Sequence, residues 1–260
     1  TRLHPAADRG SAMQVTVAKT AGFCFGVRRA LELTQKSAAL SPTCTLGELI
    51  HNRQVVEELA GQGVTVIERP EDAPAGTAVV IRSHGVGPQV YDTLRAQGSP
   101  VIDATCPFVK RIHQIAAEVP ENGLLLLAGR REHPEVQGIL GYCRGPALVF
   151  SSAEEMQELL AFLPSDGNIP VILAAQTTFS LREWEKILFF AKKVCTNLKV
   201  FDTICRATIE RQSEAKQLAQ SADAMVVVGG LHSANTTALA ALCGSYCPTA
   251  VSYTHLTLPT

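Results

Sequence analysis

The sequence lacks an excess of charge and any long hydrophobic run. Its 23 Lys and Arg residues are balanced by 24 Asp and Glu residues, which gives a formal net charge of −1. Nucleic acids and anionic membranes are bound through basic surfaces, so this balance gives no electrostatic reason to expect either partner. No apolar run approaches the length of about 20 residues that a transmembrane helix needs. We therefore predict a cytoplasmic protein with no nucleic-acid or membrane partner.

A secretory signal and a flexible linker are also missing. Residues 1–12 contain no apolar core like that of a signal peptide, and we interpret them as a non-native leader before Met13. No segment rich in Gly and Ser divides the chain. At 260 residues, the chain is long enough for one large domain or for two to three small units with soft boundaries.

Cysteine is the residue type that the sequence does have in an informative pattern. Eight cysteines in a cytosolic chain indicate reduced thiols, some of them metal-binding or catalytic. Cys24, Cys106 and Cys205 each follow a short apolar run and a turn, and each precedes a helical pattern. Asp103 and Asp202 stand three residues before the second and third of these cysteines. The backbone N–H groups and the dipole of a helix N-terminus favour a thiolate there over a thiol.

Strand-like runs alternate with helical patterns along the chain. The strand-like runs cover residues 14–18, 45–50, 64–67, 78–82, 101–103, 124–128, 147–150, 170–174, 199–201 and 224–228. The helical patterns include residues 28–39, 53–62, 154–162, 181–194 and 207–219. This alternation predicts an α/β fold with parallel or mixed sheets covered by helices. The repeated cysteine turn predicts three similar small α/β units, at residues 1–106, 107–201 and 202–260.

Polar side chains gather just after several of the apolar runs, where an open α/β sheet binds its ligands. The set is His51, His84, His133, Glu135, Thr177, Thr178, Ser233 and Asn235. Imidazole, hydroxyl and amide groups can all donate hydrogen bonds to phosphate oxygens. A single histidine at a strand end is more often structural, but the combination predicts one polar pocket for an anion. Gly229 and Gly230 do not have the spacing of a Walker or dinucleotide-binding loop.

Three cysteines from three units could hold one metal centre. Thiolate-only ligation favours zinc or an iron–sulfur cluster. A structural site normally has four protein ligands, so three cysteines would leave one position open to substrate. The alternative is that each is an ordinary buried cysteine. We expect that second role for Cys44, Cys143, Cys195, Cys243 and Cys247.

Glu135 is a candidate proton donor, because burial beside a metal pocket could tune the pKa of its carboxyl group. The alternative is a solvated carboxylate at the start of a helix. The local sequence leaves both interpretations open.

Eight short motifs lie in a fixed order between Met13 and Cys247. They are Gly-Phe-Cys-Phe-Gly-Val at 22–27, Ile-His-Asn-Arg at 50–53, Ser-His-Gly-Val at 83–86, Asp-Ala-Thr-Cys-Pro at 103–107, His-Pro-Glu-Val at 133–136, Gln-Thr-Thr at 176–178, Asp-Thr-Ile-Cys at 202–205 and Ser-Ala-Asn at 233–235. In this order, they make the sequence resemble the 4-hydroxy-3-methylbut-2-enyl diphosphate reductase (LytB) family. That family catalyses the last step of the methylerythritol phosphate route to isoprenoids.

The resemblance implies three units around a central [4Fe-4S] cluster held by Cys24, Cys106 and Cys205, with one iron open to the substrate hydroxyl. It implies a diphosphate site formed by His51, His84, His133, Ser233 and Asn235. It also implies that Glu135 supplies protons with help from His133, while Thr177 or Thr178 orients the hydroxyl group. Electrons from a ferredoxin or flavodoxin would then drive reductive dehydroxylation to isopentenyl and dimethylallyl diphosphate.

Two features depart from the family pattern. Ala234 stands where the family commonly has a second serine, which would remove one donor to the diphosphate. The family also continues for several more elements, so we expect the third unit to be incomplete and residues from about 251 to 260 to be a non-native tail.

Two other functions are compatible with the same residues. One is a zinc hydrolase with Cys and His ligands and Glu135 as general base. The other is a non-catalytic iron–sulfur redox sensor, which would need four thiolate ligands and no proton donor. Iron content and visible absorbance would separate the hydrolase from the reductase.

Overall fold

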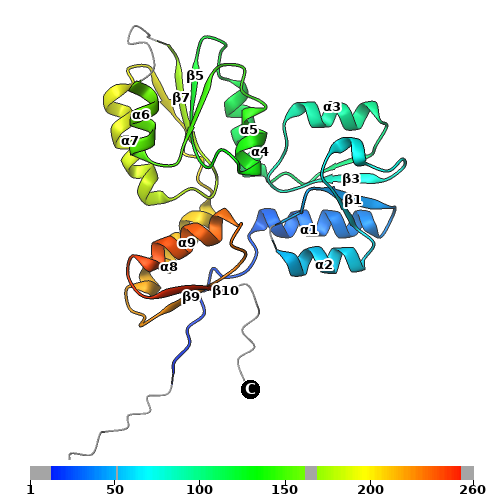
Figure 1. Ribbon diagram of the computed structural model, residues 1–260, viewed down its shortest axis with the longest axis horizontal. Coiled ribbons are helices and arrows are strands. Elements are labelled where there is room, and N and C mark those ends of the chain that lie inside the picture. Colours follow the sequence, from blue (N-terminus) through cyan, green and yellow to red (C-terminus); the bar gives the residue numbers. More distant parts are fainter. Residues whose placement is uncertain (1–12, 51, 162–168, 253–260) are drawn as a thin grey trace, which may run out of the picture.

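The computed structural model describes residues 13–50, 52–161 and 169–252, and the strands in these ranges form three separate sheets. All of the strand pairs are parallel. Figure 1 shows the sheets and their helices as three lobes that meet in the middle of the molecule. The predicted α/β fold of three units is therefore present, with parallel rather than mixed sheets.

The first unit has a four-stranded sheet in the order β2-β1-β3-β4. Its elements are α1 (Phe25–Ala38), β1 (Thr43–Leu46), α2 (Arg53–Gly61), β2 (Thr65–Ile67), the 3-10 helix η1 (Pro70–Asp72), β3 (Ala78–Ile81), α3 (Pro88–Ala96) and β4 (Val101–Asp103). Val80 packs with residues of α1 and α2, whereas Val79 and Ile81 pack with Leu94 of α3. Successive strand residues point to opposite faces, so helices cover both sides of this sheet.

The second unit has the same strand order, β6-β5-β7-β8. Its elements are α4 (Pro107–Ala117), β5 (Leu124–Ala128), α5 (Pro134–Leu140), β6 (Ala147–Phe150), α6 (Ala153–Ala161), β7 (Val171–Ala175), α7 (Leu181–Val194) and β8 (Leu198–Val200). Helices α4 and α5 cover one face, and α6 and α7 cover the other (Figure 1). Every residue of β5 and β7 is buried. Burial on both faces explains why these strands are continuous apolar runs rather than alternating ones.

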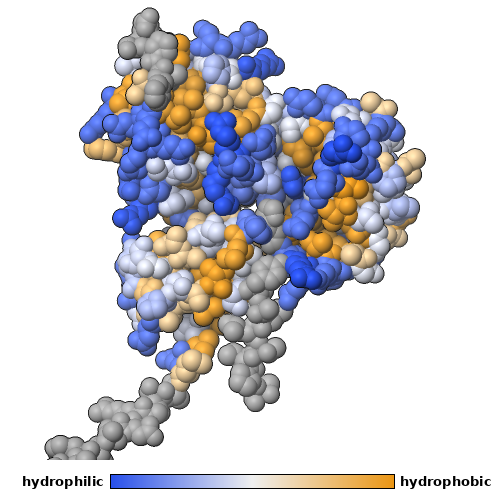
Figure 2. Space-filling model, in the orientation of Figure 1, coloured by the Kyte–Doolittle hydropathy of each residue, from blue (hydrophilic) through white to orange (hydrophobic). Residues whose placement is uncertain are grey.

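The third unit is smaller and more exposed. It consists of α8 (Arg206–Ala219), β9 (Met225–Val228), α9 (Ala234–Gly244) and β10 (Thr249–Ser252). Its buried core contains Ala215, Ala219 and Cys243, with partly buried apolar residues around them. Val226, Val228 and Leu231 are 49–65% exposed, and Figure 2 shows a band of hydrophobic surface over this lobe. The third unit therefore has a less extensive buried core than the other two.

The three units begin in the same way, with a cysteine, a helix and then a strand. The helices are α1 after Cys24, α4 after Cys106 and α8 after Cys205. Because α4 packs on the second sheet, its cysteine lies where the first unit gives way to the second. The repeat recognised in the sequence is thus a repeat of structure. The unit boundaries at 106/107 and 201/202 stay predictions.

Two strand assignments differ from the sequence-based ones. Residues 14–18 do not form a strand, and Val15 and Val17 are more than half exposed, because no neighbouring strand pairs with this apolar alternation. Strand β10 was not expected, and it forms by parallel pairing with β9. It includes Val251 and Ser252, which the sequence placed in a tail, whereas residues 1–12 and 253–260 lie outside the described residues. Within the described ranges, no helix has the length and apolar character needed to cross a membrane.

Candidate active site

Cys24, Cys106 and Cys205 each occupy the position immediately before a helix, and none of their side chains caps that helix. The surroundings of Gly26 show that the thiols of Cys24 and Cys106 are close to each other. A Cβ atom built on Gly26 would lie 2.7 Å from Sγ of Cys106 and 3.9 Å from Sγ of Cys24. Both sulfur atoms therefore lie within 4 Å of one point, and a residue without a side chain is needed there.

The thiol groups of all three cysteines interact electrostatically. Burial raises the pKa of Cys106, and the charges of Cys24 and Cys205 raise it further, although backbone hydrogen bonds at the start of α4 lower it. The N–H groups at the start of α4 favour the thiolate of Cys106, as expected, but desolvation outweighs them and the pKa of the thiol is raised overall. Coordination to a metal would deprotonate the thiol.

The ligands that Cys24, Cys106 and Cys205 could offer are thiols alone, which fits an iron–sulfur cluster rather than a single metal ion. Among the described residues, no three or more His, Cys, Asp or Glu side chains are arranged to hold a metal ion. Of the other cysteines, Cys44 lies in the core of the first unit and Cys243 in that of the third. The thiol of Cys143 donates to the carbonyl of Gly145 at 3.3 Å. These observations agree with packing roles for these three cysteines.

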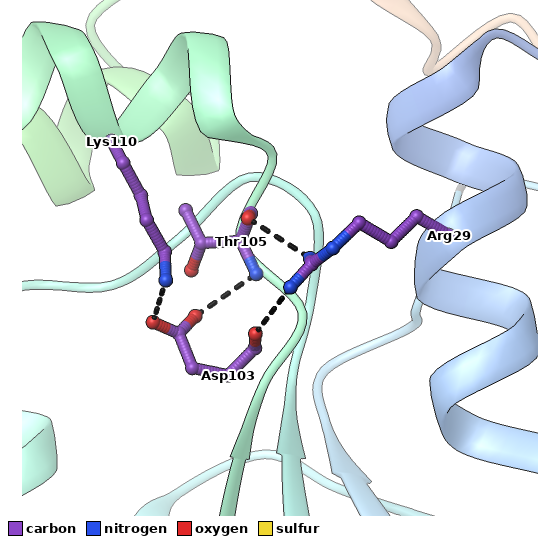
Figure 3. A network of polar contacts seen from close by, with 4 residues as sticks. All are labelled: Arg29, Asp103, Thr105 and Lys110. Carbon is purple, nitrogen blue, oxygen red and sulfur yellow. Dashed lines mark hydrogen bonds and ion pairs between the residues drawn. The ribbon is translucent and has the colours of Figure 1, made fainter. Parts of the chain in front are cut away.

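The turn before Cys106 is fixed by a network of polar contacts (Figure 3). The carboxylate of Asp103 accepts a hydrogen bond from the Thr105 N–H at 2.9 Å and pairs with Nζ of Lys110 at 2.5 Å. The guanidinium group of Arg29 donates to the carbonyl oxygens of Thr105 and Asp103 at 3.4 and 3.5 Å. Because Arg29 belongs to α1, this network joins the helix after Cys24 to the turn before Cys106.

Glu135 is a buried acid in the first turn of α5, with only 2% of its surface exposed. Its Oε1 accepts a hydrogen bond from the Thr177 N–H at 2.6 Å, and its Oε2 accepts one from the Thr177 hydroxyl at 2.8 Å. Burial raises the pKa of Glu135 to about 7, even though both hydrogen bonds from Thr177 lower it. Glu135 is therefore a buried carboxyl group with a pKa near neutrality, and the solvated-carboxylate interpretation is wrong.

His133 and His84 lie against each other beside this acid. Their rings are 5.2 Å apart in an edge-to-face arrangement. Nδ1 of His133 accepts a hydrogen bond from the Glu135 N–H at 3.2 Å. In the neutral ring, the proton is therefore on Nε2, which can donate to an anion.

The two threonines of the Gln-Thr-Thr motif have different contacts. Thr177 holds Glu135, whereas the Thr178 hydroxyl accepts a hydrogen bond from Nε2 of Gln176 at 3.1 Å. The two threonines cannot be distinguished from sequence alone, because both follow the same strand. The structure links only Thr177 directly to the carboxyl group of Glu135.

Two backbone hydrogen bonds join the cysteine turns to the polar strand ends. The N–H of Cys106 donates to the carbonyl of Ser83 at 3.0 Å, one residue before His84. The N–H of Cys205 donates to the carbonyl of Thr177, also at 3.0 Å. These bonds place the turns that carry Cys106 and Cys205 beside the strand ends that carry His84 and Thr177.

The remaining predicted residues are less tightly connected. Ser233 precedes α9, and its hydroxyl accepts a hydrogen bond from the Thr236 N–H at 3.4 Å, while Asn235 lies in the first turn of that helix. Their placement beside a diphosphate stays a prediction. His51 lies outside the described residues. The sequence does not indicate that Gly26 and Arg29 support the site, since Gly26 lies against Cys106 and Arg29 against Thr105, both more than 70 positions away.

Comparison with known proteins gives consistent results. The family model described as LytB protein matches residues 15–255. A curated protein of Caldanaerobacter subterraneus subsp. tengcongensis is 40% identical over 244 residues, covering 90% of this chain and 82% of its own length. One of Desulfovibrio desulfuricans is 43% identical over 237 residues, covering 88% and 82%. Both are named 4-hydroxy-3-methylbut-2-enyl diphosphate reductase.

Solved structures agree with the sequence relatives. The E-1-hydroxy-2-methyl-but-2-enyl-4-diphosphate reductase of Plasmodium falciparum superposes with a TM-score of 0.83 at 27% identity, over 91% of this chain and 75% of that one. A second structure, described as (E)-4-hydroxy-3-methyl-but-2-enyl diphosphate reductase, the terminal enzyme of the non-mevalonate pathway, gives 0.67 at 36% identity, over 91% and 84%. The α/β fold is confirmed by both.

Proposed function

Because this chain belongs to the LytB protein family, we infer that it is a 4-hydroxy-3-methylbut-2-enyl diphosphate reductase, which forms isopentenyl and dimethylallyl diphosphate in the last step of the non-mevalonate pathway. The overall reaction consumes two electrons and two protons, breaks the C–O bond of the 4-hydroxyl group and releases water. The relatives do not favour the zinc hydrolase or the redox sensor. The observation that carries the proposal is the buried acid Glu135, which Thr177 joins to the turn at Cys205.

We propose that Cys24, Cys106 and Cys205 hold a [4Fe-4S] cluster with one open iron. When bound, the cluster supplies electrons and a Lewis acid for the substrate hydroxyl. The thiol-only donor set and the glycine that makes room between two of the sulfurs support this assignment. We further propose a ferredoxin or flavodoxin as the electron donor.

The protein's own groups divide into anion binding and proton delivery. His84 and His133, with His51, Ser233 and Asn235, are proposed to donate hydrogen bonds to the diphosphate. The Nε2–H tautomer of His133, set by the bond that its Nδ1 accepts, supports this role. Glu135 is the proton donor, and the Thr177 hydroxyl can accept its proton while donating its own to the leaving oxygen. The negative charge of a bound diphosphate keeps Glu135 protonated, since a nearby like charge raises the pKa of a carboxyl group.

The test is turnover after anaerobic reconstitution with iron and sulfide, using a chemical reductant. We expect brown protein with about four irons per chain, by the composition of the cluster, and formation of both diphosphate products from 4-hydroxy-3-methylbut-2-enyl diphosphate. Active protein that contains zinc and no iron would support the hydrolase instead. A loaded cluster without any turnover would support the redox sensor.

The acid role of Glu135 predicts how activity depends on pH. We expect kcat/KM to fall as the pH rises through about 7, because the free enzyme must carry the proton on Glu135. Thr177→Val removes the hydroxyl that donates to Glu135 and relays its proton, so activity should drop. The pKa of the carboxyl group should rise, and the activity that remains should fall at higher pH than in the parent protein. Profiles are to be measured with saturating reductant at each pH.

Thr178→Val is the matched control for this shift, because the Thr178 hydroxyl contacts Gln176 rather than Glu135. Its profile should fall at the same pH as that of the parent protein. If Thr177→Val leaves the profile in place, another group supplies the proton.

A further inference from the structure

The first cysteine of the site is reached by a segment without regular structure. Among the described residues, the chain from Met13 to Cys24 contains no helix or strand. Val15 and Val17 are 53% and 74% exposed, so burial does not hold this part of the chain. Helix α1 fixes Cys24 on one side, through Arg29 and the turn before Cys106. On the other side, the residues just before Cys24 can support it only through polar contacts.

Glu214 provides the first part of that support. Its carboxylate accepts three hydrogen bonds from the segment, one from the Lys19 N–H at 2.7 Å, one from the Thr20 N–H at 2.8 Å and one from the Thr20 hydroxyl at 2.6 Å. The hydrogen bonds from Thr20 and Lys19 lower the pKa of Glu214, so the group accepts all three as a carboxylate at neutral pH. Charge-assisted hydrogen bonds of this kind are stronger than neutral ones.

Arg211 provides the second part, one turn earlier on the same helix. Its Nε donates to the carbonyl of Thr20 at 3.2 Å, and its Nη2 donates to the carbonyl of Gly22 at 2.5 Å. Residues three apart lie on one face of a helix, so Arg211 and Glu214 together bind the hydrogen-bond donors and acceptors of residues 19–22. Gly22 has a φ of +96°, a turn that a side chain would strain, and it brings the chain round to Cys24.

The helix that carries both residues is itself fixed to the second unit. Nε2 of Gln212 donates to the carbonyl of Phe179 at 3.0 Å, and Oε1 of Gln212 accepts from the Leu181 N–H at 3.0 Å. This helix, α8, begins directly after Cys205. The 19–22 segment is thus attached to the helix whose N-terminus carries the third cysteine.

We propose that Arg211 and Glu214 are positioning residues that clasp the 19–22 segment onto α8 and thereby hold Cys24 at the distance from Cys205 that a shared cluster requires. This rests on the proposed function, because the cluster is the group that the clasp would serve. The clasp joins residues more than 185 positions apart in the chain, one group just before Cys24 and the other in the helix that follows Cys205. Holding a ligand in place raises its effective concentration at the metal and slows its loss.

The experiment compares two charge-neutral double variants of α8. The clasp variant is Arg211→Gln with Glu214→Gln. The control is Arg206→Gln with Glu210→Gln, which removes an exposed ion pair of 2.7 Å on the same helix. Both variants replace one Arg and one Glu, so a change that follows from helix charge alone would appear in both.

Two measurements are made on each protein. The first is the amide exchange rate of Lys19 and Thr20 in the absence of added iron. The second is the decay of the visible absorbance of the reconstituted cluster after addition of a chelator. In the clasp variant we expect both rates to rise by roughly tenfold or more, since hydrogen bonds to charged groups contribute about 1.5–3 kcal/mol. The control should behave as the parent protein does.

A clasp variant whose Thr20 amide exchanges faster while its cluster persists as long as that of the control would overturn the proposal, because the contacts would then be structural only. Unchanged exchange of both amides would overturn it too. If the parent protein itself takes up no iron, the proposed function fails, and the clasp loses its role with it. That failure is recognisable because all three proteins would then share it.

Discussion

Replacing Glu135 with glutamine is expected to lower kcat by about 10²- to 10⁴-fold, the usual contribution of a positioned general acid. Iron content and substrate affinity should stay close to those of the parent protein. Glutamine keeps the shape of the side chain and an oxygen that can accept from Thr177, but it carries no acidic proton. The measurement is single-turnover and steady-state kinetics with a chemical reductant, together with iron analysis of the same samples.

Glu132→Gln is the matched control, because this carboxylate is exposed and lies three residues away in the chain. It should keep nearly full activity. Near-normal turnover in Glu135→Gln would assign the proton to another group. A large loss of iron in that variant would instead make Glu135 a support of the metal centre.

The same variant is expected to be more stable than the parent protein at alkaline pH. In the folded protein the pKa of Glu135 is raised to about 7, above its value in the unfolded chain. The protonated side chain therefore makes its full contribution to stability at any pH below the pKa of the unfolded chain. That contribution is lost as the pH rises through about 7, because the buried carboxylate then has to carry its charge. Melting temperatures measured below and above neutrality should therefore fall less with rising pH in Glu135→Gln than in the parent protein.

Replacing Gly26 with alanine is expected to abolish cluster binding although it changes no ligand. The added methyl group would lie 2.7 Å from Sγ of Cys106, a distance that real Cβ atoms essentially never show, so Cys106 or α1 must move. Alanine also favours a helix over glycine by about 1 kcal/mol, so α1 itself should remain folded. Iron per chain after reconstitution and far-ultraviolet circular dichroism measure the two effects separately.

Gly61→Ala is the control for this substitution. Gly61 also lies in a helix, and nothing stands within 4 Å of a Cβ atom built on it. This variant should bind a full cluster and be slightly more stable. Normal iron content in Gly26→Ala would mean that the two sulfurs are free to separate, contrary to a shared centre.

The sequence was most informative where structure is local. The cysteine turns, the helices after them and the buried strands follow from apolar spacing and from cysteine position within a few residues. Helix α7 has the predicted bounds, Leu181–Val194, because a serine N-cap and an uninterrupted amphipathic pattern define it. Gln14 to Ala18 has an equally strand-like pattern but finds no partner strand, so local pattern alone was misleading there.

Features that depend on distant parts of the chain were not predictable. Whether Glu135 is buried or solvated depends on Thr177, which contacts it from the turn after β7, 42 positions later. Arg211 and Glu214 bind the N-terminal segment, although the sequence around them is that of an ordinary exposed helix. The same holds for Arg29, whose role appears only when α1 is placed beside the turn at Asp103.

The three sheets differ in size, so the free energy of local unfolding should differ among the three lobes. Segments that bury little apolar surface undergo local unfolding at the lowest free energy. The two-stranded sheet of β9 and β10 rests on a small core of alanines and a cysteine, whereas the other two sheets are covered on both faces. Helix α8 is fastened through Gln212 to the second unit. The third lobe should therefore open locally at β9, α9 and β10, while α8 stays attached to the second unit and leaves Cys205 in place. Under the proposed diphosphate role of Ser233 and Asn235, α9 would then be a movable wall of the substrate site.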